Sequence, residues 1–145
     1  MTAVFEKHNL NFMYPDNWKL SENPETDEFI EVSLESPGGS IWSVSIFADP
    51  EGEPHDLVES CATALSEQYE DFERFEFEGE IAGIPAVGFD SHFYCLDFLV
   101  TAQSRALRHE DRLFNIFCQA ESREFDKNSD VFQAITLSLL SQVKG

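Results

Sequence analysis

The stretch "IPAVGFDSHFYCLDFLVTAQSRALRHEDRLFNIFCQA", residues 84–120, decides the fold of this chain. It contains three long apolar-rich runs, at residues 84–95, 96–107 and 112–120, and a polar tip at residues 108–111 separates the second run from the third. Runs of this kind predict β-strands, and consecutive strands joined by short connections pair antiparallel. We therefore expect an antiparallel meander of three strands.

The segments on the N-terminal side of the meander also predict strands. Residues 4–14 predict one strand, which ends in a turn at residues 15–17. Residues 28–35 and 41–47 alternate apolar and polar side chains on either side of the turn sequence "SPGGS", which predicts a hairpin.

A further strand is expected directly before the meander, in "RFEFEGEI" at residues 74–81. Its strict alternation predicts that Phe75 and Phe77 point inward and that the glutamates point outward. A charged outer row of this kind is typical of an edge strand or of a strand with one face in solvent.

Two segments have helical periodicity instead. Residues 54–70 begin with Pro54, which suits a first helical turn, and carry an apolar stripe on one side. Residues 129–142 predict a second amphipathic helix, which follows a charged hinge and is capped by Asn128 or Ser129. Its expected buried residues are Val131, Phe132, Ile135, Leu139 and Leu140.

The order of these elements is several strands, a helix, four strands and a helix. Because strands and helices do not alternate strictly, we expect the α+β class, with an antiparallel β-sheet flanked by helices. A chain of 145 residues is long enough for one core, and no linker or repeat divides it. The sequence therefore predicts a single domain over residues 1–145.

Charge indicates which partners this domain would accept. The formal net charge is −19, and residues 1–100, with 22 acidic and 3 basic side chains, carry all of the excess. Such a field repels nucleic acid and anionic membrane surfaces, so neither is expected as a partner. It favours a protein partner with a basic or apolar surface; the alternative is that the charge serves solubility alone.

Targeting features and cysteine usage predict the compartment. The first residues lack the basic and apolar regions of a signal peptide, and no run of 18 apolar residues occurs. Cys61, Cys95 and Cys118 are odd in number and lack CxxC spacing, as expected for reduced thiols. We therefore expect a cytoplasmic protein without a disulfide framework.

Several motifs together resemble the PsbP-like superfamily. They are "FMYPDNW" (12–18), "GGSIWSVSIF" (38–47), "YEDF" (69–72), "GEIAGIPAVGFD" (79–90) and "NIFCQAESREFDKNSDVFQAITLSL" (115–139). That superfamily includes the extrinsic photosystem II protein, the Ran-binding nuclear import factor and the Eag chaperones of type VI secretion effectors. The resemblance implies an α/β/α sandwich and a non-catalytic role in adaptor, chaperone or assembly functions, with no catalytic residue to carry over.

Polar residues of the meander form the first candidate binding site. If the three strands pair as expected, one sheet face carries a polar row that could line a cavity or contact a ligand. The alternative is a solvated or helix-covered face with satisfied hydrogen bonds. The row consists of Asp90, His92, Tyr94, Thr101, Gln103 and Arg105, with Asn115 and Gln119 from the third strand.

A basic cluster at the tip between the second and third strands is the second candidate. Arg105, Arg108, His109 and Arg112 could together receive a carboxylate, a phosphate or an acidic patch of a partner. The alternative is neutralisation by Glu110 and Asp111, or by the acidic half of a second copy in a homodimer.

The sequence gives little support for a catalytic or metal-binding site. His92 and Cys95 are three residues apart on a strand and therefore point to opposite faces, so they do not form a nucleophile–base pair. His55 and Glu59, four apart at an exposed helix start, provide too few ligands for a specific metal site. We expect no catalytic residue, no metal and no cofactor.

These observations lead to two hypotheses about function. The first is a non-catalytic, cytosolic protein-binding module, an adaptor or an effector-specific chaperone with an acidic surface. The alternative is a small-ligand-binding or hydrolytic protein that uses the sheet face around Asp90, His92 and Tyr94. Self-association through an edge strand is a third way to use the same surface.

Overall fold

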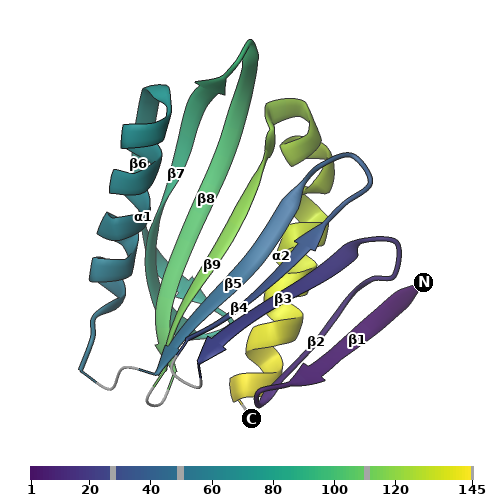
Figure 1. Ribbon diagram of the computed structural model, residues 1–145. Helices are drawn as coiled ribbons and strands as arrows, with labels where there is room; N and C mark the ends of the chain where they lie inside the picture. The colour runs from purple at the N-terminus through teal and green to yellow at the C-terminus, as the bar shows by residue number, and fades with distance from the viewer. Residues whose placement is uncertain (27–28, 49–50, 110–111, 145) are drawn as a thin grey trace.

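The computed structural model describes residues 1–26, 29–48, 51–109 and 112–144. Within these ranges nine strands and two helices follow one another along the chain (Figure 1). They are β1 (Thr2–Lys7), β2 (Leu10–Pro15), β3 (Lys19–Thr26), β4 (Phe29–Glu35), β5 (Ile41–Ala48), α1 (Pro54–Gln68), β6 (Glu70–Ile81), β7 (Ile84–Cys95), β8 (Phe98–His109), β9 (Arg112–Glu121) and α2 (Ser122–Lys144).

Seven of the strands form one sheet in the order β3-β4-β5-β9-β8-β7-β6, and each neighbouring pair is antiparallel. The predicted meander is confirmed as β7-β8-β9, and the predicted hairpin as β4-β5. The pairing of β5 with β9 joins these two units into one sheet. β3 and β6 are therefore its two edges.

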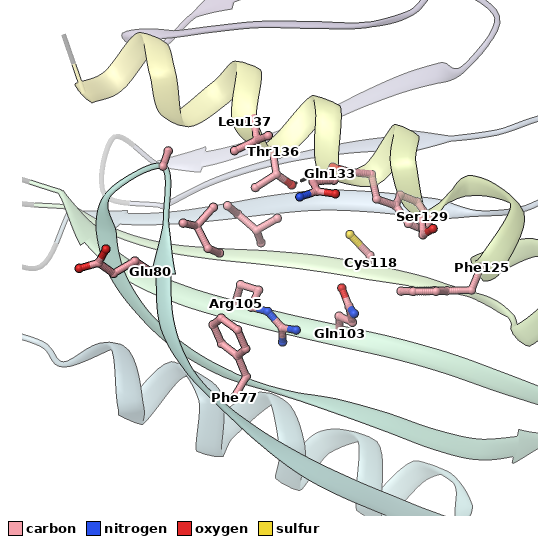
Figure 2. Close-up of a pocket in the computed structure, with 14 residues that line it drawn as sticks. Phe77, Glu80, Gln103, Arg105, Cys118, Phe125, Ser129, Gln133, Thr136 and Leu137 are labelled. Carbon is pink, nitrogen blue, oxygen red and sulfur yellow. Dashed lines mark hydrogen bonds between the residues drawn. The ribbon is translucent and has the colours of Figure 1, made fainter.

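Helices cover the two faces of the sheet unequally. On one face, the α1 face, α1 packs on the half formed by β6 to β9 and leaves β3 to β5 uncovered. On the other, the α2 face, α2 packs on β8 and β9, and the separate β1–β2 hairpin lies beside α2. Figure 2 shows the two helices on opposite sides of the sheet. This arrangement confirms the α+β class and the α/β/α sandwich.

Each face has its own apolar core. The α1 face buries Val58, Ala62 and Leu65 of the helix against Phe89 and Phe93 of the sheet. The larger core lies on the α2 face, where the fully buried Trp42 donates its indole N–H to the Thr136 hydroxyl at 3.0 Å. This hydrogen bond fixes the position of α2 over the sheet, because a buried indole N–H without a partner is costly.

The N-terminal segment differs from the prediction in two ways. The strand expected at 4–14 is a hairpin, because His8 and Asn9 adopt left-handed conformations with φ of 57° and 61° and turn the chain between β1 and β2. β3 was not predicted, since it has few apolar residues besides the partly buried Leu20. It is a strand because it pairs with β4.

The C-terminal helix begins earlier than predicted, at Ser122 instead of Ser129. The expected charged hinge is its first two turns. The Glu121 carboxylate accepts the backbone N–H of Glu124 at 3.4 Å, and the Phe125 ring is buried with its centroid 5.2 Å from that of Phe132. Across the described helices, none has the length and apolar character needed to cross a bilayer.

Candidate functional site

A cavity of about 430 Å³ lies between α2 and the β6, β8 and β9 part of the sheet (Figure 2). Its walls are mainly apolar, with a few amide, hydroxyl and charged groups among them. The lining residues are Phe77, Glu80, Ile81, Ala82, Gln103, Arg105, Ile116, Cys118, Phe125, Ser129, Phe132, Gln133, Thr136 and Leu137.

The cavity exists because α2 covers only part of its face. The helix packs on β8 and β9, so the α2-facing side chains of β6 and β7 extend beyond it. Figure 2 shows the turn between β6 and β7 rising towards α2. Ile81 and Ala82, at this turn, line the cavity. Ala82 and Gly83 have φ of 53° and 79°, the left-handed pair that a tight two-residue hairpin requires.

Arg105 lies on the cavity floor, and its guanidinium is hydrogen-bonded to neighbouring groups of the sheet. Nη2 donates to the Asp90 carboxylate at 2.7 Å, while Nη1 donates to the carbonyl oxygens of Phe89 and Ser104 at 3.1 and 3.0 Å. The guanidinium carbon is 3.9 Å from the centroid of the Phe77 ring. Arg105 therefore ties β6, β7 and β8 together, and it presents a stacked, largely neutralised cation to the cavity.

His92 and Thr101 lie on the same face, next to the start of α2. Nδ1 of His92 is 3.1 Å from Oγ1 of Thr101, which is in turn 2.8 Å from Oγ of Ser122. The His92 ring also packs edge-on against Phe75 at 6.0 Å. This chain of contacts joins β7 and β8 to α2, outside the lining of the cavity.

The structure therefore brings six of the predicted residues to one face. Across the ladder, Asp90 pairs with Gln103, His92 with Thr101, and Tyr94 with Leu99. Gln103 and Arg105 line the cavity, whereas Asp90, His92, Tyr94 and Thr101 do not.

The other two residues of the predicted row, Asn115 and Gln119, lie on the α1 face. They pair with Ala106 and Ala102 of β8, whose side chains belong to the α1 core. Asn115 accepts a hydrogen bond from the Ser104 hydroxyl at 2.8 Å. The prediction that they share a face with His92 is wrong, because the pairing register places Ile116 and Cys118 there instead.

The basic tip is not a single cluster. Arg105 lies in the cavity, as described above, whereas Arg108 and Arg112 are on opposite faces near the end of the hairpin. Arg108 donates to the carbonyl oxygen of Gly52, and Arg112 donates to that of His8 at 3.1 Å. Both side chains therefore link the tip to the rest of the fold.

His109 pairs with Arg112 across the ladder. Glu110 and Asp111, the residues proposed to neutralise the tip, lie outside the described residues.

The thiols are placed as small core residues. Cys118 is buried beneath the cavity, and burial raises the pKa of its thiol well above the usual range. Burial also raises the pKa of Cys61 on α1. His92 and Cys95 point to opposite faces, as predicted, since Cys95 packs with the α1 core.

His55 and Glu59, which were not expected to form a metal site, contact each other, and Glu59 is bound mainly by Arg74. His55 Nε2 is 3.8 Å from Glu59 Oε1, but both Glu59 oxygens accept hydrogen bonds from Arg74, at 2.7 and 3.0 Å. These hydrogen bonds lower the pKa of the Glu59 carboxyl. Throughout the described chain, no group of three His, Cys, Asp or Glu residues is arranged to hold a metal ion.

Exposed apolar side chains on the α2 face were not anticipated. Phe75, predicted to point inward, is 51% exposed, and Tyr94 is 50% exposed. Leu99 pairs with Tyr94, and Leu137 of α2 stands at the cavity with 41% of its surface exposed. We call Phe75, Tyr94, Leu99 and Leu137 the apolar rim. The alternation of apolar and polar residues did not predict this exposure, because the sequence pattern does not show where a covering helix ends.

Comparisons with known proteins identify the fold. No protein-family model and no curated protein matches this sequence. Among solved structures, the cyanobacterial PsbP protein of Synechocystis is similar with a TM-score of 0.66 and 13% identity, over 95% of this chain and 89% of that protein. The chain therefore has a PsbP-like fold, as the resemblance implied.

Two other solved structures share this architecture. A Pseudomonas aeruginosa protein of unknown function is similar with a TM-score of 0.57 and 14% identity, over 95% of both chains. LpqN of Mycobacterium tuberculosis, which is involved in cell envelope biogenesis, has a TM-score of 0.50 and 12% identity over 87% of this chain and 79% of its own.

Proposed function

We propose that this PsbP-like domain is a non-catalytic module that binds a protein partner, as an adaptor or an effector-specific chaperone. The observation that carries the proposal is the open cavity beside α2 together with the apolar rim. A cavity and exposed large apolar side chains on the same sheet face are together typical of a surface that receives a partner's side chains.

The polar groups of the site support a binding role over a catalytic one. Arg105 is engaged by Asp90 and by two carbonyl oxygens, and Cys118 is a buried thiol of raised pKa. A nucleophilic thiol needs a lowered pKa and a neighbouring base. The groups on the cavity floor therefore favour orientation of a bound segment.

The charge of the chain supports a particular class of partner. A net charge of −19 attracts a protein with a basic surface around an apolar segment, and it opposes nucleic acid and anionic membranes. Cys61, Cys95 and Cys118 are unpaired, which supports a reducing compartment such as the cytoplasm.

The test first identifies the partner by crosslinking and then measures how substitutions at the site change its affinity. A photo-crosslinking amino acid in place of Leu137 should capture a protein that the same group at Ala64, on the outer surface of α1, does not capture. Binding of the purified partner is then measured by calorimetry for Leu137→Asp and for Ala64→Asp, two exposed positions that acquire the same charge.

We expect Leu137→Asp to raise the Kd at least roughly tenfold, because a buried contact would be replaced by a desolvated carboxylate, while Ala64→Asp leaves it unchanged. Equal Kd values for both variants and the unsubstituted protein would place the binding surface elsewhere.

A small ligand is the second candidate occupant. The cavity volume falls within the range of ligand pockets. The Thr101 hydroxyl, between an imidazole and a second hydroxyl, lies on the same face but outside the cavity lining. Binding or hydrolysis of a small ester that is abolished in His92→Ala would favour this alternative.

A further inference from the structure

Strand β6 is an edge of the sheet with an unoccupied side. It spans Glu70–Ile81, and in the described structure it pairs with β7 alone. After a register shift between Glu70 and Glu73, its ladder with β7 continues regularly to Ile81. The outer side therefore presents a long row of backbone N–H and C=O groups suited to a further strand.

The opposite edge of the sheet differs. β3 is shorter, its pairing with β4 is irregular between Pro24 and Thr26, and the β1–β2 turn is tied to it. Lys7 and His8 both contact Glu22, at 3.0 and 3.5 Å. β6 is thus the more accessible of the two edges.

The side chains of β6 alternate in chemistry between the two faces. Glu76, Glu78 and Glu80 occupy successive positions of one row, while Phe75 and Phe77 belong to the other row, next to the cavity. Glu76 has a described partner in Arg74, whereas Glu78 and Glu80 make no described ion pair. From Phe75 to Ile81 the row on the α2 face is therefore apolar, and Glu73 precedes it in the same row. The other row is acidic from Glu76 to Glu80, and Glu80, next to the turn, also reaches the cavity.

We infer that β6 is a docking edge for an extended protein segment in which basic and apolar residues alternate, an inference that rests on the proposed protein-binding function. Each basic residue of such a segment lies opposite or diagonal to a glutamate, and each apolar residue lies beside Phe75, Phe77 or the cavity. Backbone hydrogen bonds to the β6 edge provide affinity, and the alternation provides specificity.

A second copy of this chain does not fit the same edge. A two-fold axis perpendicular to the sheet would join two β6 strands antiparallel and keep each face continuous, so the glutamate row would meet its own copy. Like charges directly opposite one another are destabilising. With six acidic residues and one arginine on β6, the edge selects a basic chain over itself.

The experiment uses a synthetic peptide of four lysines and four valines in strict alternation. Its Kd for the full-length protein is measured by fluorescence anisotropy, and the β6 amides are followed by ¹⁵N NMR and hydrogen exchange. A peptide of the same composition in two blocks tests alternation, and one with glutamate in place of lysine tests charge. Two further peptides carry backbone N-methyl groups on all lysines or on all valines.

We expect the alternating peptide to bind and to slow exchange along β6. We expect the block and glutamate peptides to bind at least roughly tenfold more weakly. One of the two N-methylated peptides should lose binding and the other should retain it. In a β-strand every second residue directs its N–H group to the same edge, so only one of the two sets of N–H groups faces β6. Equal binding of all peptides, or loss of both or neither N-methylated form, would overturn strand addition.

Protein variants locate the site. Glu76→Gln/Glu78→Gln/Glu80→Gln should raise the Kd of the alternating peptide roughly fivefold to tenfold, whereas Glu6→Gln/Glu35→Gln, two exposed glutamates on β1 and β4, should not change it. Equal effects per charge removed would show that net charge, and not β6, binds the peptide.

The cavity variant separates this inference from the proposed function. Leu137→Asp on α2 tests the cavity with the natural partner, whereas the glutamine variants of β6 test the edge with the peptide. If peptide binding fails while Leu137→Asp still weakens the natural partner, the docking edge is wrong and the protein-binding function stands.

Discussion

At the scale of single residues, Gly88 shows how closely the cavity floor is assembled. It pairs with Arg105 across the ladder of β7 and β8, and a Cβ added there would lie 1.8 Å from the Ser104 carbonyl oxygen. That oxygen also accepts a hydrogen bond from Arg105. The absent side chain therefore permits the close approach of strands that positions the guanidinium.

We predict that Gly88→Ala lowers the free energy of unfolding by about 3 kcal/mol, because the clash is with backbone, which cannot rotate away. Gly79→Ala is the matched control, since its Cβ would meet the movable Phe77 ring at 3.3 Å, and it should cost less than about 1 kcal/mol. Urea unfolding followed by tryptophan fluorescence measures both. Similar values for the two variants would contradict the explanation.

Cys118 should make the protein less stable in alkaline solution. Burial raises the pKa of the folded thiol, whereas the unfolded thiol titrates at about 8.5. Above that pH the unfolded chain releases a proton that the folded chain keeps, so the free energy of unfolding falls by up to about 1.4 kcal/mol per pH unit for this thiol. Below it the contribution is fully present.

Unfolding in urea with a reductant at pH 8, 9 and 10 measures this slope. Cys118→Ala should have a shallower slope than the unsubstituted protein, even though the substitution itself lowers stability. Cys95→Ala, which leaves the buried thiol in place, should keep the steep slope. Parallel slopes for all three proteins would mean that other groups cause the alkaline loss.

At the scale of elements, the sequence predicted the strands and the helix whose apolar residues follow a regular period. The alternation in β4, β5, β7, β8 and β9 and the 3.6-residue stripe of α1 reflect which side faces the core, so these elements were found. β3 has little such pattern, and it forms because an adjacent strand provides its hydrogen bonds. The Asn115 and Gln119 error has a similar cause, because the face of a side chain depends on interstrand register.

The early start of α2 follows from a packing contact that local signals did not reveal. Phe125 and Phe132 are seven residues apart, two helical turns, and both are buried against the sheet. The charged residues between them led us to expect a hinge. The cavity was likewise unpredictable, because it depends on how much of the sheet α2 covers.

We predict that Phe125→Ala lowers the free energy of unfolding by about 3 kcal/mol and frays the first two turns of α2. Hydrogen exchange should then accelerate at residues 122–128 more than at residues 132–140. Leu137→Ala, on the same helix but 41% exposed, should cost less than about 1 kcal/mol and leave the first turns protected. Uniform acceleration along α2 would contradict local fraying.

At the scale of the whole molecule, the same charge opposes folding and, on the proposed function, attracts a basic partner. The chain has 28 acidic and 9 basic residues, so repulsion between carboxylates outweighs the exposed ion pairs, each of which contributes at most about 1 kcal/mol. A basic partner relieves that repulsion, whereas the unbound chain retains it. Added salt therefore has opposite effects on the two equilibria.

We predict that raising NaCl from 0.1 to 1 M at pH 7, which shortens the screening length from roughly 10 Å to roughly 3 Å, increases the free energy of unfolding by about 1 kcal/mol or more. The same change should raise the Kd of the alternating lysine–valine peptide at least roughly tenfold. The control is the stability measurement near the isoelectric point, about pH 4.2, where screening of net repulsion vanishes and only salting-out of apolar surface remains. Salt-dependent stability of equal size at both pH values would show that self-repulsion is not the cause. A salt-independent Kd would show that charge does not hold the alternating peptide on β6.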